Sequence, residues 1–241
     1  MPMDTSKVRV PKKIENDGLV NAIIYIQYKS DYNELFIDSK LNDLLTTKNQ
    51  NWEMIYTPNA GKIVGGVQIP TRFFANPIYK IQITSSLIAF NFVNKYPGWE
   101  AYRSLIVDVC SLLDSFITIE ELRINYVSVY SNIKIFDYLD GVIKLNNLPS
   151  FYGTQYNFRC TVGKENNFGA LATLSLTNED PIPNSFTNGK QNVRSIVNIT
   201  VEGKLSDKSF EDYLDFLHTT EKDLFFRIVN QDFVDHHNPT Y

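Results

Sequence analysis

Residues 78–93 read IYKIQITSSLIAFNFV, and the fold depends on this stretch. Two runs of β-branched and aromatic residues, Ile78–Thr84 and Leu87–Val93, are joined by a turn at Ser85–Ser86. Such residues favour pleated strands, and so short a link favours antiparallel pairing. The stretch therefore predicts two paired strands, and the aromatic content of 13% agrees with a sheet-rich core.

Three helices are predicted around these strands. Residues 34–47, 98–117 and 207–233 carry apolar side chains at the three- and four-residue spacing of one helix face. Pro97 suits the start of the second helix, where its missing N–H costs nothing, and Trp99 is expected to anchor that helix to the sheet. The predicted fold class is therefore α+β, an antiparallel sheet with three main helices packed on it.

The chain is expected to have four segments. Residues 1–17 are polar and predict a flexible N-terminal arm, and residues 131–150 are a weakly patterned connection. Residues 18–130 and 151–241 each combine a strand meander with a long helix, which suggests two similar α+β halves without a residue-level repeat. The expected strands are 19–28, 52–56, 62–69, 78–84, 87–93, 121–130, 152–162, 170–177 and 192–202.

The charge and composition argue against a duplex-binding, secreted or membrane-spanning protein. The net charge of −4 over 241 residues argues against a basic duplex-binding face. The opening residues lack the apolar core of a signal peptide, and no run reaches the roughly 18 apolar residues of a membrane helix. A cytoplasmic protein without membrane contact is predicted. Cys110 and Cys160 lie in apolar stretches and are expected to be buried thiols in a reducing compartment.

Catalytic patterns are sparse. Residues 61–66, GKIVGG, lack the spacing of a phosphate-binding loop, and the few His and Cys residues lack the spacing of a zinc site. No cofactor and no metal are therefore expected. One enzymatic alternative stays open, a metal-dependent nuclease that uses Glu121 with a neighbouring basic residue. Such an enzyme would bring several acids, or Arg103 and Arg123, into one cleft with shifted pKa values.

The preferred hypothesis is a non-enzymatic binding or accessory module that acts through a macromolecular partner. Residues 201–241 hold nine acidic and four basic side chains. At the start of the last helix Glu211, Asp212 and Asp215 offset the helix dipole, and on a solvent-facing surface they would complement a basic partner.

A second candidate contact is the long, turn-rich loop at residues 178–191. Its members Asn184, Phe186 and Lys190 are candidate contact residues, because loops on rigid scaffolds commonly carry recognition. The expected partner is another protein. The basic residues within 7–13 give nucleic acid only weak support, and the oligomeric state is left open.

Three stretches carry a family resemblance. They are DGLVNAIIYI at 17–26; FNF at 90–92 with YPGWEAYR at 96–103 and LRINYV at 122–127; and the closing helix from Leu217 to Phe233. These stretches resemble a sporadically distributed prokaryotic family of proteins of unknown function and similar length, with Asn21 where that family commonly has Glu. The family has no agreed activity, so the resemblance implies no catalytic residues. Its patchy distribution resembles that of mobile and defence genes and implies such a context.

Overall fold

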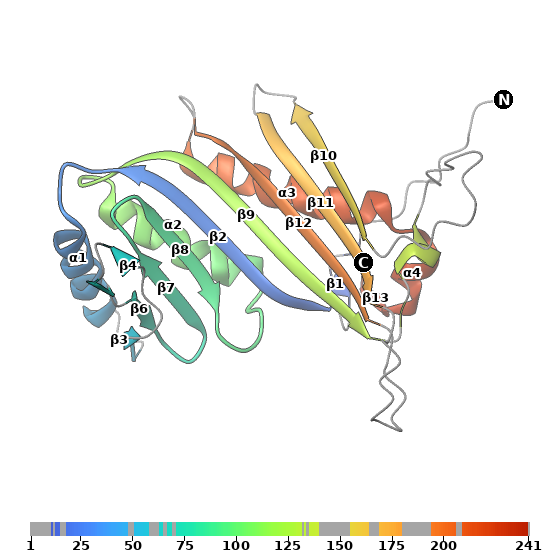
Figure 1. Ribbon diagram of the computed structural model, residues 1–241, viewed down its shortest axis with the longest axis horizontal. Coiled ribbons are helices and arrows are strands. Elements are labelled where there is room, and N and C mark those ends of the chain that lie inside the picture. The colour runs from blue at the N-terminus through green and yellow to red at the C-terminus, as the bar shows by residue number, and fades with distance from the viewer. Residues whose placement is uncertain are drawn as a thin grey trace. The chain divides into compact units, whose positions relative to one another are not determined.

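Figure 1 shows a computed structural model of the chain. The structure describes residues 11, 13–14, 18–47, 51–57, 63–64, 67–68, 71–131, 133, 135–139, 155–163, 169–179, 194–205 and 209–240. The chain divides into two compact units. Unit 1 comprises residues 1–20, 125–201 and 215–241, and unit 2 comprises residues 21–124 and 202–214.

The elements confirm the α+β class with a large antiparallel sheet and three main helices. The helices are α1 (Glu34–Thr47), α2 (Trp99–Leu113), α3 (Phe210–Ile228), α4 (Gln231–His236) and the 3-10 helix η1 (Ile135–Tyr138). The strands are β1 (Lys13–Ile14), β2 (Leu19–Lys29), β3 (Glu53–Thr57), β4 (Ile63–Val64), β5 (Val67–Gln68), β6 (Thr71–Ala75), β7 (Tyr79–Ile83), β8 (Leu87–Phe92), β9 (Thr118–Ser131), β10 (Gln155–Gly163), β11 (Gly169–Glu179), β12 (Arg194–Lys204) and β13 (Pro239–Thr240). The main sheet has nine strands in the order β10-β11-β12-β9-β2-β8-β7-β6-β3.

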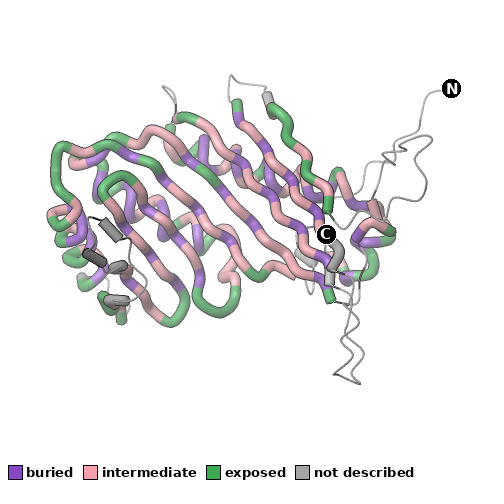
Figure 2. Tube along the Cα trace, in the orientation of Figure 1, coloured by how far each residue is buried: buried purple, intermediate pink, exposed green. Residues whose placement is uncertain are grey.

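The predicted antiparallel pair is present in unit 2. Strands β7 and β8 pair with Tyr79 opposite Phe92 and Ile83 opposite Ile88. Buried and half-buried residues alternate along both strands, as Figure 2 shows, so each strand has one face in the core. Figure 1 shows α2 behind β2 and β8.

Helix α2 begins at Trp99 after Gly98, whose φ of 92° favours glycine. The aromatic residue of α2 that is fully buried is Tyr102, which is 0% exposed, whereas Trp99 and Pro97 are half-buried. The ring of Tyr102 stacks on that of Tyr79, with 6.2 Å between the centroids. Tyr102 therefore has the anchoring geometry that the sequence analysis expected of Trp99.

Unit 1 contains most of α3, all of α4, β10 and β11, and parts of β9 and β12. Helix α3 packs on β9 through His218, whose Nδ1 lies 3.5 Å from the hydroxyl of Tyr126. The single helix predicted to run to residue 233 is wrong, because α3 ends at Ile228 and α4 begins at Gln231. Asn230 causes the break: its side chain accepts a 3.0 Å hydrogen bond from the Phe233 N–H, which is the geometry of an N-cap.

Several other features of the structure differ from the sequence-based expectations. Lys13–Ile14, within the predicted flexible arm, form β1 and pair with β13. The single strand predicted over 62–69 is the separate pair β4 and β5, and β6 was not predicted. The predicted halves 18–130 and 151–241 differ from the two units, because β9 and α3 each run from one unit into the other. Cys110 is buried as expected, but Cys160 is exposed on β10.

Candidate functional site

The predicted acidic surface on α3 is partly neutralised. Glu211 and Asp212 are exposed and Asp215 is half-buried. The Oε2 atom of Glu211 lies 2.9 Å from Nη2 of Arg103 on α2, so this acid forms an ion pair instead of standing as an isolated negative charge. The Asp212 N–H donates to the Ser209 hydroxyl at 3.4 Å, which places the backbone of Asp212 in the helix start.

The predicted loop contacts Asn184, Phe186 and Lys190 lie outside the described residues. Among the predicted contact residues, Glu211, Asp212 and Asp215 are the ones whose positions are known.

The two arginines expected at a nuclease centre lie in separate ion pairs within unit 2. Arg103 pairs with Glu211, and Arg123 pairs with Glu202 at 2.6 Å between Nε and Oε2. Glu120 pairs with Lys29. Within the described ranges no three His, Cys, Asp or Glu side chains are grouped so that they could hold a metal ion.

Two titratable side chains of α3 in unit 1 have shifted pKa values and were not predicted: Glu221 is buried and His218 is half-buried. Burial raises the pKa of Glu221 to about 8, and burial together with Lys222 lowers the pKa of His218 to about 4. Glu221 is only 7% exposed. The sequence did contain a signal, because Glu221 stands four residues after Leu217 and four before Phe225, on the apolar stripe of the helix.

A small pocket lies in unit 2 between α1, β7 and α2. Its volume is about 90 Å³, and the polar groups that line it belong to Tyr79, Ser104 and Asp108. Ligand sites for drug-sized molecules usually measure roughly 300–1,000 Å³. The pocket is thus large enough for a few water molecules and too small for an ordinary cofactor.

One face of strands β9 to β12 in unit 1, which we call the polar face, combines half-buried and exposed residues. Figure 1 shows α3 on the opposite side of β10 to β12. The members of the polar face are half-buried on β9, β11 and β12 and exposed on β10. They are Asn125, Val127 and Val129 of β9; Gln155, Asn157, Arg159 and Thr161 of β10; Leu171, Thr173, Ser175 and Thr177 of β11; and Ile196, Asn198 and Thr200 of β12.

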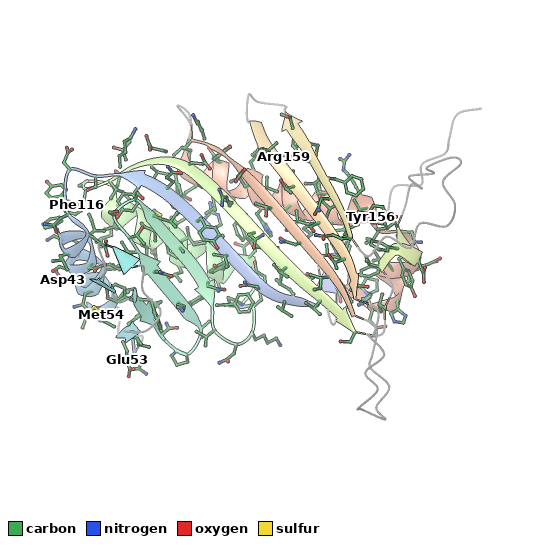
Figure 3. The ribbon with its side chains drawn as sticks, viewed as in Figure 1. Asp43, Glu53, Met54, Phe116, Tyr156 and Arg159 are labelled. Atoms are coloured by element: carbon green, nitrogen blue, oxygen red, sulfur yellow. The ribbon has the colours of Figure 1, made fainter. Side chains whose placement is uncertain are left out.

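Hydrogen bonds between side chains order the polar face. The Asn125 Nδ2 group donates to Oδ1 of Asn198 at 2.6 Å and to Oγ1 of Thr200 at 2.8 Å. At the β10 edge, Gln155 donates to the Ser175 hydroxyl at 3.3 Å. Figure 3 labels Arg159 and Tyr156 on β10. Arg159 belongs to the polar face, opposite Thr173, whereas Tyr156 lies opposite the buried Leu176 on the other face.

The polar face was not predicted, although its pattern is present in the sequence. Polar residues alternate with buried Leu and Ala along 170–177, and Asn198 and Thr200 alternate with Val and Ile. An alternating pattern identifies a half-buried strand, but it does not show that neighbouring strands place these residues on one continuous surface.

Comparison with known proteins does not assign the chain to a family. No family model matches it, and no curated protein matches it. The resemblance to a prokaryotic family of unknown function therefore stays a prediction. No helix of the described part of the chain is long and apolar enough to cross a bilayer.

Proposed function

We propose that the protein is a non-enzymatic binding module that acts through contact with another protein, and that the polar face of unit 1 makes this contact. The observation that carries the proposal is the low charge of this face. Among its described members Arg159 alone is charged, and it stands on the outermost strand. The rest are amides, hydroxyls and aliphatic side chains.

This chemistry favours a protein partner over nucleic acid. The buried cores of protein interfaces are depleted of charged residues and mix apolar with hydrogen-bonding groups. On the polar face Val127, Leu171 and Ile196 supply the apolar part, and Asn125 and Asn198 supply amides. A surface for duplex or single-stranded nucleic acid would instead need several Lys or Arg side chains to neutralise phosphates.

The order already present on the polar face also supports binding. Because Asn125 is hydrogen-bonded to both Asn198 and Thr200, these side chains hold fixed positions before a partner arrives. Less side-chain entropy is then lost on association, which favours affinity. The acids Glu211, Asp212 and Asp215 stay in the proposal as a second contact, and a mobile or defence gene context stays part of it.

Site-specific photo-crosslinking in the native host tests the proposal. A photoreactive amino acid at Ile196 on the polar face is expected to capture one protein, and the same amino acid at the exposed His236 of α4 is the control. Capture of nucleic acid at Ile196, or capture of the same protein equally well at His236, would contradict the proposed surface.

The captured protein is then purified and its affinity for the chain is measured by calorimetry. Thr173→Lys places a charge in the middle of the polar face and is expected to weaken binding about tenfold or more, because a buried unpaired charge is costly. Thr219→Lys is the matched control, because Thr219 is exposed on α3. Equal affinities of the two variants would rule out the polar face as the contact.

A further inference from the structure

Strand β10 is a regular strand at the end of the sheet order. It has nine residues and pairs with β11 without a bulge, from Gln155 opposite Thr177 to Gly163 opposite Gly169. In the part of the chain that the structure describes, no strand pairs with its outer edge. An outer strand presents a row of backbone N–H and C=O groups that can pair with another strand.

The sequence of β10 has few of the features that protect outer strands. Natural edges are kept from pairing by short length, Lys, Pro or bulges. Strand β10 reads QYNFRCTVG, with neither Lys nor Pro and with Arg159 as its one charge. The strand at the opposite end of the order, β3, has five residues and begins with the charged Glu53. The edge of β10 is therefore the better suited of the two to pair with a further strand.

Two aromatic rings of β10 are incompletely covered. Tyr156 and Phe158 lie opposite Leu176 and Leu174, which are buried, yet both rings are only half-buried. The rings stack on each other with 6.4 Å between centroids and 12° between planes. Side chains of a further strand beside β10 would remove more of this aromatic surface from water.

We infer that β10 pairs antiparallel with β10 of a second copy of this chain, with Phe158 opposite Phe158 of the second copy. A two-fold axis perpendicular to the sheet makes the two edges antiparallel, and one residue must then lie opposite its own copy. Full overlap would put Arg159 opposite Arg159, and like charges directly opposite each other destabilise a sheet. The register must therefore differ from full overlap of the two β10 strands.

Centring the axis on Phe158 avoids the contact between the two Arg159 side chains and keeps the rings of Tyr156 and Phe158 in the interface. Residues 155–161 of the two copies then pair, Asn157 lies opposite Arg159 of the second copy, and Tyr156 lies opposite Cys160 of the second copy. An axis through Cys160 would leave Tyr156 opposite residue 164, beyond the end of β10. Aromatic pairs and an Arg–Asn pair across strands are favourable, so the edge is complementary to itself in this register.

This dimer is independent of the proposed function and adds to it, because the sheet continues across the axis and the two polar faces become one surface. Sedimentation of the purified full chain from about 1 to about 100 μM tests for it, since this range brackets micromolar dissociation constants. The expected species is a dimer at the upper end of the range. A monomer at every concentration would overturn the inference.

A pair of opposite substitutions tests the position of the interface. Asn157→Lys places a second positive charge opposite Arg159 of the other copy, twice by symmetry, and should raise the dissociation constant about three- to tenfold. Asn157→Asp should lower the dissociation constant. The double variant Asn157→Lys with Arg159→Asp should restore the dissociation constant to that of the parent. Thr219→Lys is the control, because Thr219 is exposed on α3 and is no member of the proposed interface. Circular dichroism melts show whether each variant is folded, and equal dissociation constants for all variants would overturn the inference.

Disulfide formation tests the register. In a Cys160→Ser background, Phe158→Cys should give a crosslinked dimer under mild oxidation, since directly opposite residues have Cα atoms about 4.5–5.5 Å apart. The native Cys160 side chains of the two copies would be four residues apart along the strands, roughly 13 Å, and should not crosslink. Crosslinking through native Cys160 without crosslinking at position 158 would overturn this register. Because these measurements use the purified chain alone, their failure is distinct from failure of the proposed protein contact.

Discussion

The hydroxyl of Tyr102 donates a 3.0 Å hydrogen bond to the main-chain carbonyl oxygen of Ala22, and this bond joins α2 to β2 within unit 2. Both residues are 0% exposed. A buried donor that lost its acceptor would bear the full cost of desolvation, so the bond specifies how α2 sits on its strand as well as adding stability.

Substitutions in α2 should show that Tyr102 is the main anchor. Tyr102→Phe keeps the ring and loses the hydrogen bond, so it should cost about 1 kcal/mol of unfolding free energy. Tyr102→Ala also leaves a cavity and should cost about 3–5 kcal/mol. Trp99→Ala removes a ring that is only half-buried and should cost less than Tyr102→Ala. Urea unfolding gives all three values, and a larger loss for Trp99→Ala would contradict this order.

The buried Glu221 should make the protein less stable as the pH rises. Burial raises the pKa of this carboxyl from 4.5 to about 8, so the folded chain holds the proton more tightly than the unfolded chain does. The stability associated with Glu221 is therefore fully present below pH 4.5 and is lost as the pH rises towards 8. Glu221→Gln should remove this loss, so its free energy of unfolding at pH 8.5 should exceed that of the parent by about 2–4 kcal/mol.

The titration of His218 determines the pH range in which the effect of Glu221→Gln on stability is best measured. Burial lowers the pKa of its ring from 6.5 to about 4, so the folded chain is destabilised as the pH falls from 6.5 towards 4. Below pH 6.5 the titrations of His218 and Glu221 change stability in opposite directions as the pH rises. Above pH 6.5 the change in stability comes from Glu221. Melting temperatures of the parent and Glu221→Gln between pH 6.5 and 8.5 should therefore diverge, and parallel curves would contradict the assignment to Glu221.

Gly18 should tolerate no side chain. Its φ is +69°, and an added Cβ would lie 2.7 Å from the ring of Tyr130 and 2.9 Å from the carbonyl oxygen of Val129. Gly18→Ala should cost about 2–4 kcal/mol from backbone strain and overpacking together. Gly169→Ala is the matched control, because a Cβ there meets nothing within 4 Å. Equal melting temperatures for the two variants would show that the backbone at Gly18 adapts freely.

Nuclease assays test the enzymatic alternative directly. The purified chain is incubated with single- and double-stranded DNA and RNA in the presence of Mg²⁺ or Mn²⁺. We expect no cleavage above a buffer control, because Arg103 and Arg123 lie in separate ion pairs with Glu211 and Glu202. Cleavage that is abolished by Glu121→Gln or Asp212→Asn would show that the protein is a metal-dependent nuclease and would displace the binding proposal.

The sequence by itself determined the elements whose pattern is local. Helix α1 has the predicted bounds 34–47, and β7 and β8 lie within the predicted strands on either side of Ser85–Ser86. Side-chain periodicity depends only on residues within a few positions of each other, so it can be read without knowing the fold. The same locality explains the missed break at Asn230, because the apolar repeat continues past it to Phe233.

The tertiary structure decided everything that depends on residues far apart in the chain. Arg103 and Glu211 are 108 residues apart, and Asn125 and Asn198 are 73 apart, yet each pair lies within hydrogen-bonding distance. The order of the strands decides whether polar residues form one surface, and burial decides whether Glu221 holds its proton. Spacing along the sequence cannot supply this information, because hydrogen bonding, ion pairing and desolvation depend on distances in space.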